Sequence, residues 1–139
     1  MKRSGGNRMI KWGGGILAFI GAGHLTVGLL ASSSYVGDWF SLRLWGHWWE
    51  DTTMAMSFWA NPAGFGLPLA LIGVLVVWLD RNGIVPPAFL AWTVLAWAVL
   101  CALLVEPTPA PVVVIAAAVL LRGIYSATGA KIEVPEAVS

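Results

Sequence analysis

One long apolar run, residues 9–31, constrains this chain more than any other part of its sequence. After Lys11 the run continues for about 20 residues without a charged side chain. A helix of that length, rising about 1.5 Å per residue, crosses a hydrocarbon core about 30 Å thick. Basic residues precede the run, as in a secretory signal peptide, but the run is longer than the about 7–15 residues of a signal core. We therefore expect a retained transmembrane helix.

Three glycines recur at seven-residue intervals in this run, Gly14, Gly21 and Gly28. Seven residues make about two helical turns, so the glycines share one face of the helix, and His24 lies on that face as well. Small residues let a neighbouring helix approach closely in a membrane, which predicts a helix-packing stripe. The imidazole of His24 either binds a lipophilic ligand or relays protons, or it is a neutral ring that hydrogen-bonds a neighbouring helix. Both interpretations stay open.

The composition predicts a membrane environment for the whole chain. Of its 139 residues, 58% are hydrophobic and 11% are charged, and the mean hydropathy is +0.79. Soluble domains contain about 45–50% apolar and about 25% charged residues. The net charge of +1 leaves no basic surplus to neutralise phosphates, which argues against a nucleic-acid partner. Cys101 is the one cysteine, so no intrachain disulfide forms and no thiol chemistry is expected.

Three further apolar segments follow, and with the first they predict an all-α, four-helix transmembrane bundle in a single domain. The four spans are expected at residues 9–31, 53–79, 87–105 and 110–125. With four spans, seven of the lysines and arginines share one side, and Arg43 alone lies on the other. This distribution predicts an N-in/C-in topology, with both termini in the cytoplasm.

The second span is long, and the pair Asn61-Pro62 interrupts it. A proline inside a helix removes one backbone donor and clashes with the preceding turn, which predicts a kink. Alternatively, Asn61 caps a new helix that has Pro62 at its first position. An amide beside a freed carbonyl is a polar spot in an apolar setting, so Asn61 is a candidate ligand-binding residue, together with Trp59. Beyond the break a second small-residue stripe is predicted at Ala63, Gly66, Ala70 and Gly73.

Residues 38–51 carry four of the nine tryptophans and are predicted to form an amphipathic segment at the outer membrane interface, between spans one and two. On a helix, His47, Glu50 and Asp51 share one face, which suits an acid–base pair or a divalent metal, and they are the candidate catalytic residues. The alternative is a solvated polar face on which Asp51 caps the second span. No third histidine completes a tetrahedral set, so no metal is predicted. Arg43 is expected to pair with Glu50 or Asp51.

The order and spacing of several short motifs resemble a family of small, functionally uncharacterised bacterial integral membrane proteins with four spans. The resemblance covers roughly residues 9–121 and rests on Lys11-Trp12-x-Gly14, Gly21-x-x-His24-x-x-x-Gly28, Phe58-Trp59 with Gly64 and the run from Gly66 to Gly73, Val77-Trp78-Leu79-Asp80-Arg81, Pro86-Pro87-x-x-Leu90-x-Trp92, and the proline-containing break from Glu106 to Pro111. The family has no established activity. The resemblance therefore implies a multi-pass protein of the bacterial inner membrane and no mechanism.

Two functions are carried forward. The first is an accessory or lipophile-binding subunit that forms a homo-oligomer or joins a larger membrane complex through its glycine and alanine stripes. The alternative is a small membrane enzyme or carrier for a hydrophobic substrate, with its polar groups supplied by His24 and Asn61 or by His47 and its acidic neighbours. The tryptophans either anchor the chain at the interface or line a cavity for a flat hydrophobic or cationic ligand. No cofactor is expected, because the two histidines are predicted at different depths and cannot together ligate a haem.

Overall fold

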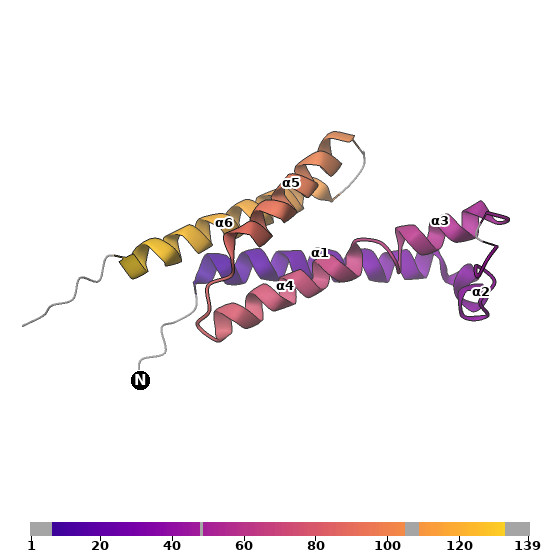
Figure 1. Cartoon of the computed structure of the whole chain (residues 1–139), viewed down its shortest axis with the longest axis horizontal. Helices are drawn as coiled ribbons and strands as arrows, with labels where there is room; N and C mark the ends of the chain where they lie inside the picture. The colour runs from indigo at the N-terminus through magenta and orange to yellow at the C-terminus, as the bar shows by residue number, and fades with distance from the viewer. Residues whose placement is uncertain (1–6, 48, 105–108, 133–139) are drawn as a thin grey trace, which may run out of the picture. The chain divides into compact units, whose positions relative to one another are not determined.

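The computed structural model describes residues 7–47, 49–104 and 109–132, and the regular elements of this part of the chain are all helical (Figure 1). In chain order they are α1 (Arg8–Ala31), the short 3₁₀ helix η1 (Ser33–Tyr35), α2 (Val36–Phe40), α3 (Thr52–Ala60), α4 (Gly66–Arg81), α5 (Ala88–Leu104) and α6 (Ala110–Ile132). The predicted all-α fold class is confirmed for these residues. The predicted end of the third span at residue 105 and the start of the proline-rich break at residues 106–108 lie outside the described residues.

Two of the described helices are long and apolar enough to cross a membrane, namely α1 and the part of α6 from Ala110 to Gly129. Helix α5 is also apolar but has 17 residues, fewer than the about 20 that a full crossing uses. The predicted second span is divided between α3, with 9 residues, and α4, with 16. Length and composition thus make α1 and α6 candidates for membrane crossing, and the four-span bundle stays a prediction.

A break at residues 61–65 separates α3 from α4 where the sequence predicted a kink. Asn61 is the C-terminal cap of α3, and its Nδ2 donates to the carbonyl oxygen of Ser57 at 2.9 Å. Because α4 begins at Gly66, the interpretation in which Asn61 caps a new helix starting at Pro62 is wrong. A proline disfavours the helical conformation for the residue before it, so the helix ends at this point. Ala63 consequently lies outside α4 and its predicted stripe.

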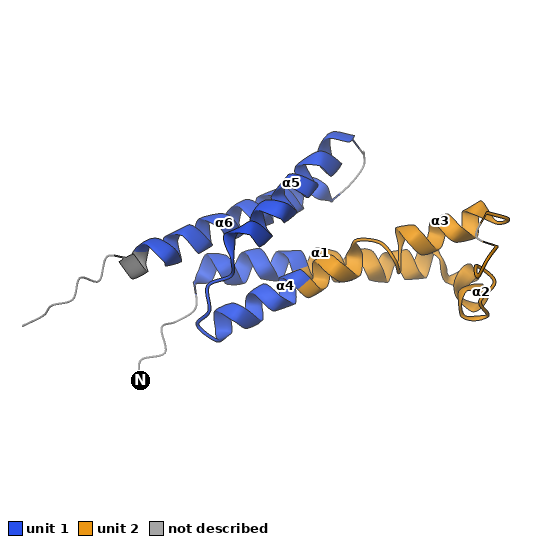
Figure 2. Ribbon diagram, in the orientation of Figure 1, with its two compact units in different colours: residues 1–17, 72–139 blue, residues 18–71 orange. Residues whose placement is uncertain are grey.

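The chain divides into two compact units, which Figure 2 colours separately. Unit 1 contains residues 1–17 and 72–139, and unit 2 contains residues 18–71. In unit 1, α5 and α6 pack side by side. They are antiparallel, because Trp92 near the start of α5 donates from Nε1 to the hydroxyl of Tyr125, well into α6, at 3.1 Å.

Small side chains let the helices of unit 1 approach closely. The buried residues of α5 and α6 include Ala91, Val94, Ala98, Ala110, Val113, Ala116 and Ala117. A Cβ added to Gly13 of α1 would lie 2.8 Å from Cβ of Leu120 in α6. One added to Gly14 would lie 3.0 Å from the carbonyl oxygen of Gly73 in α4. Helix α1 therefore packs on α4 and α6 at distances that only glycine permits.

A buried carboxylate and the side chain of Asn7 connect α1, α4 and α6 in unit 1. The side chain of Asp80, near the end of α4, is 4% exposed, and its Oδ1 accepts from the backbone N–H of Asn7 at 2.8 Å. Asn7 caps α1, because its Oδ1 accepts from the N–H of Met9, and its Nδ2 donates to the carbonyl oxygen of Gly123 in α6 at 2.9 Å. Lys11 places Nζ 4.0 Å from Oδ2 of the carboxylate. A negative charge at the start of α1 also complements the helix dipole.

In unit 2, the remainder of α1 packs against the start of α4 and the end of α3. A Cβ added to Gly21 would lie 2.6 Å from the carbonyl oxygen of Gly66, and one added to Gly28 would lie 2.7 Å from Cγ of Asn61. Asn61 also donates from Nδ2 to Oγ of Ser32, a buried residue just after α1, at 2.7 Å. The glycines that the sequence assigns to helix packing thus meet other helices of the same chain.

Candidate functional site

An apolar cavity of about 680 Å³ lies in unit 2 and is here termed the aromatic cavity. Its wall comes from α2, from α3 and from the turns between them, and consists of Trp39, Leu42, Leu44, Trp45, Phe58 and Trp59. Small-molecule sites typically enclose about 300–1,000 Å³ and are lined mainly by apolar and aromatic side chains. The size and the lining of this cavity therefore suit a lipophilic molecule.

Contacts between α2 and α3 hold the aromatic wall in place. Trp39 on α2 donates from Nε1 to the carbonyl oxygen of Met54 on α3 at 3.4 Å, and its ring meets Phe58 edge to face at a centroid distance of 5.7 Å. Phe58 makes a second edge-to-face contact with Trp59, at 5.9 Å. Edge-to-face pairs are favourable and fix the relative orientation of the rings. Trp45 and Trp59 remain 81% and 62% exposed, so their rings are accessible to a ligand.

The wall between α2 and α3 is built of turns. Leu42 has a φ of 60° and Gly46 a φ of 78°, and both values belong to the left-handed region that a right-handed helix excludes. For a leucine this conformation costs about 1–2 kcal/mol relative to a right-handed one. The side chain of Leu42 nevertheless lines the aromatic cavity. Among the described residues of the predicted interfacial segment, regular helix is limited to the first ones, which belong to α2.

A second cavity, of about 430 Å³, is lined in part by the same turns and is here termed the polar cavity. It is lined by Arg43, His47, Glu50, Asp51 and Met54. The structure thus brings the three candidate catalytic residues around one space. The helical spacing assumed from the sequence does not apply, because residues 41–47, 49 and 50 form turns and Asp51 directly precedes α3.

Ion pairing in the polar cavity differs from the expectation. Arg43 donates from a guanidinium nitrogen to Oδ1 of Asp38 at 2.8 Å, whereas the sequence predicted a bond to Glu50 or Asp51. The hydrogen bond to Asp38 and the charge of that carboxylate raise the pKa of Arg43 above its ordinary value, and the charge of Asp51 adds to the effect. Arg43 therefore stays protonated at physiological pH.

The remaining polar groups of this cavity also have partners. His47 places Nδ1 at 2.7 Å from Oε1 of Glu50, a hydrogen-bond distance between an imidazole and a carboxylate. Oδ1 of Asp51 accepts from the backbone N–H of Met54 at 2.9 Å and caps α3. Asp51 thus has the capping role that the alternative interpretation gave it.

His24 lies at the break between α3 and α4. Its Nε2 is 3.3 Å from the carbonyl oxygen of Ala60, the last residue of α3, and its ring stacks on Phe65 at a centroid distance of 4.0 Å. With a proton on Nε2 the imidazole donates to this carbonyl, which lacks a helical partner because α3 ends there. The arrangement is the one that the structural interpretation of His24 describes, a ring bonded to a neighbouring helix.

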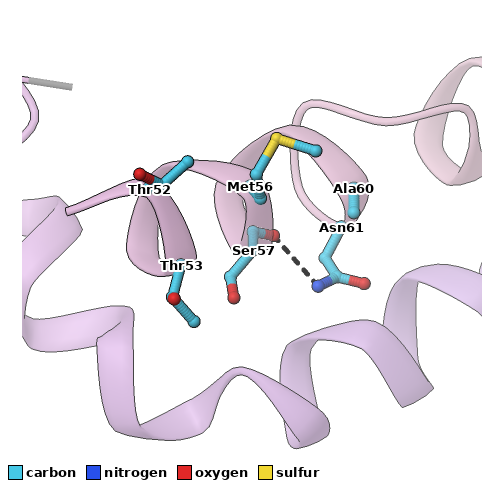
Figure 3. A pocket seen from close by; sticks show the side chains of 6 residues that line it. All are labelled: Thr52, Thr53, Met56, Ser57, Ala60 and Asn61. Atoms are coloured by element: carbon cyan, nitrogen blue, oxygen red, sulfur yellow. Dashed lines mark hydrogen bonds between the residues drawn. The ribbon is translucent and has the colours of Figure 1, made fainter. Parts of the chain in front are cut away.

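A shallow groove of about 460 Å³ borders Asn61 (Figure 3). It is lined by Thr52, Thr53, Met56, Ser57, Ala60 and Asn61. Figure 3 shows the amide of Asn61 turned back toward Ser57, whose carbonyl oxygen accepts its hydrogen bond. Of the candidate ligand-binding residues, Asn61 therefore borders this groove, Trp59 lines the aromatic cavity, and His24 lies at the helix break.

The sequence-based reasoning missed two features. Trp39, Leu42 and Trp45 were included only in an interfacial segment, although they form half of the aromatic wall. The one available signal is Gly46, whose preference for turns marks a chain reversal between two aromatic clusters. The buried role of Asp80 was also missed, and a carboxylate beside Arg81 at the end of an apolar helix gives no indication of it.

No curated protein and no solved structure matches this chain. A family defined from sequences does match, over residues 8–126, and its description is a family of unknown function, DUF6463. The matched region contains α1 to α5, most of α6 and all three cavities. The chain therefore belongs to the family of unknown function DUF6463.

Proposed function

We propose that the chain is a multi-pass protein of the bacterial inner membrane, with four crossings made by α1, by α3 together with α4, by α5 and by α6. Large apolar side chains support this proposal, because they are exposed along every one of the long helices: Phe19, Leu30, Leu71, Leu75, Leu100, Leu103 and Ile115. Soluble monomers rarely expose so much contiguous apolar surface. In this topology the turns between α2 and α3 face outward.

Single-cysteine labelling tests the topology in a Cys101→Ser background. Ser41→Cys is expected to react with a membrane-impermeant maleimide on intact spheroplasts. Arg81→Cys is expected to react only after the membrane is permeabilised. Equal labelling of both positions from outside would contradict the N-in/C-in arrangement.

Within that membrane protein, we propose that the aromatic cavity binds a lipophilic small molecule. The observation that carries this proposal is the 680 Å³ space enclosed by three tryptophans, one phenylalanine and two leucines. Apolar surface around a cavity of this size contributes binding free energy when a ligand displaces water or lipid from it. Its position between α2 and α3 would give a ligand access from the outer interface.

We also propose that the chain forms a homo-oligomer or docks onto a larger membrane complex. The contact surface would differ from the predicted stripe of Gly14, Gly21 and Gly28. Gly21 and Gly28 are occupied within the chain, whereas a Cβ added to Gly15 or Gly23 would meet nothing within 4 Å. The face of α1 that carries Gly15 and Gly23 is therefore open to a partner helix.

Native mass spectrometry of the protein extracted in mild detergent tests the ligand. The wild-type protein is expected to retain a small lipophilic molecule, and the Trp45→Ala/Trp59→Ala variant to lose it. Trp12→Ala, which removes an exposed tryptophan from the start of α1, serves as the matched control and should retain it. Identical spectra for all three proteins would rule out the aromatic cavity as the binding site.

A second candidate function is proton transfer on the bound molecule. The 2.7 Å contact between His47 and Glu50 favours it, because a carboxylate that orients an imidazole is a common general-base arrangement. His47→Asn would then abolish turnover of the retained molecule while leaving its binding intact. Unchanged turnover would restrict the protein to binding.

A further inference from the structure

We propose that the aromatic cavity and the polar cavity form one site for an amphiphilic organic cation. The apolar body of this ligand occupies the aromatic cavity, and its amine or quaternary ammonium head lies toward the polar cavity. The inference rests on the proposed lipophile binding and adds the chemical class of the ligand. It follows from the stretch of chain that contributes to both linings, from the charges of the carboxylates and from the exposed tryptophan rings.

The two cavities share one stretch of chain. Between residues 42 and 47, Leu42 and Trp45 line the aromatic cavity, whereas Arg43 and His47 line the polar cavity. Met54 adds a second connection, because it lines the polar cavity and its carbonyl oxygen accepts the indole N–H of Trp39 in the aromatic wall. The linings of the two cavities therefore alternate along one short stretch of chain, which is the basis for treating them as parts of one site.

Carboxylates outnumber fixed cations in this part of the chain. Residues 36–61 contain Asp38, Glu50 and Asp51 but only one guanidinium, that of Arg43. Arg43 donates a hydrogen bond to Asp38 and also interacts electrostatically with Asp51, so one guanidinium charge faces two carboxylates. Even if His47 is counted as a cation, the three carboxylates exceed the positive charges in this stretch by one. The polar cavity is consequently complementary to a positive charge.

The aromatic side favours the same charge. The faces of tryptophan rings carry negative potential and attract ammonium groups within about 6 Å, and Trp45 and Trp59 expose their rings beside the cavity. The phosphate of a zwitterionic phospholipid would be repelled by Glu50 and Asp51. The preferred ligand is therefore a lipophilic cation without an attached phosphate.

Three probes of similar shape separate charge from hydrophobicity: tetraphenylphosphonium, tetraphenylborate and neutral triphenylphosphine oxide. The full-length protein in phosphatidylcholine nanodiscs is titrated with each by calorimetry, with empty nanodiscs as the blank. Tetraphenylphosphonium is expected to bind saturably and about tenfold more tightly than triphenylphosphine oxide. Tetraphenylborate is expected to show no saturable binding above the blank.

Two variants test which residues are responsible. Glu50→Gln combined with Asp51→Asn removes both charges, and asparagine preserves the cap of α3. This double variant is expected to lose about tenfold in affinity for tetraphenylphosphonium and to bind triphenylphosphine oxide unchanged. Glu136→Gln, which removes a carboxylate outside residues 36–61, is the matched control and should bind all probes as the wild type does.

The outcomes distinguish this inference from the proposed function. If the cation and the neutral probe bind equally, and both are lost in Trp45→Ala/Trp59→Ala, the cavity binds lipophiles and the preference for cations is overturned. Tighter binding of tetraphenylborate overturns it as well. Absence of saturable binding for every probe overturns both proposals. Choline should displace tetraphenylphosphonium more readily than glycerophosphocholine does, and the reverse order would assign the site to a phospholipid headgroup.

Discussion

The contact between α5 and α6 in unit 1 and residues 36–61 in unit 2 use apolar side chains in opposite ways. In unit 1, α5 and α6 meet over alanines such as Ala116 and Ala117, both fully buried, and even the carboxylate of Asp80 is enclosed. In unit 2, residues 36–61 leave large rings uncovered, and the side chain of Phe40 is 85% exposed. The first arrangement is dense, and the second surrounds open space.

This difference predicts that the stability of the fold and the binding of a ligand depend on different residues. Small complementary surfaces give tight packing, and changes in their volume are felt directly. Large rings around a cavity contribute little to the packing of the free protein and remain available for a ligand. We therefore expect substitutions in the glycine and alanine contacts to affect folding, and substitutions in the aromatic wall to affect ligand retention.

The largest effect on stability is expected for Gly21→Leu, within unit 2 itself. A side chain at this position would meet the backbone of Gly66 and Ala70, which cannot move aside without separating α1 from α4. The loss should reach at least about 3 kcal/mol and abolish the folded protein in detergent, as measured by thermal unfolding. Gly37→Leu, at a helical glycine of unit 2 where an added Cβ meets nothing within 4 Å, should unfold at the wild-type temperature. A stable Gly21→Leu variant would contradict the close contact between α1 and α4.

A smaller effect is expected for Asp80→Ala in unit 1. Removal of the carboxylate leaves the backbone N–H of Asn7 without its acceptor and should cost about 1–3 kcal/mol. Thermal unfolding of the detergent-solubilised protein measures this loss. The exposed pair between Asp38 and Arg43 offers the comparison, because Asp38→Ala should change stability by less than about 1 kcal/mol. Equal losses would mean that the buried carboxylate has no special role.

The contact between Asn61 and Ser32 should contribute about 1 kcal/mol. Asn61→Ala and Ser32→Ala are each expected to lower stability, and the double variant to lose less than the sum of the two single losses. The coupling in this double-mutant cycle, measured by reversible denaturation in mixed micelles, reports the hydrogen bond itself. Strictly additive losses would show that the two side chains act independently.

The smallest effect on stability is expected for Trp45→Ala. Its side chain is 81% exposed, so the free energy of unfolding should stay within about 0.5 kcal/mol of the wild-type value. Retention of the lipophilic molecule should nevertheless fall, as measured by native mass spectrometry. A large loss of stability would erase the contrast between the two units, because the aromatic wall would then belong to the packed core.

Part of this structure follows from the sequence. The apolar run at residues 9–31 corresponds to α1 within one residue at its start, and the cap formed by Asp51 follows from its position before an apolar segment. The partner of the glycine stripe does not follow, because small residues permit close packing without specifying whether the neighbouring helix belongs to the same chain.

The aromatic cavity could be predicted less well than the helices. Tryptophans near a membrane boundary usually act as anchors, so their number alone does not indicate a cavity. The decisive local feature is the turn at Leu42, and nothing about a leucine predicts a left-handed backbone conformation. The meeting of His47, Glu50 and Asp51 was expected, but the turns that produce it were not.

Leu42 also indicates how this protein could be engineered. Glycine adopts a φ of 60° without steric cost, so Leu42→Gly should make the turn easier to form and at the same time remove one side of the aromatic cavity. The backbone conformation would then favour glycine at position 42, whereas the lining of the aromatic cavity would favour leucine. Under the proposed function, the side chain of Leu42 would contribute to ligand binding while its backbone conformation carries a local cost in stability.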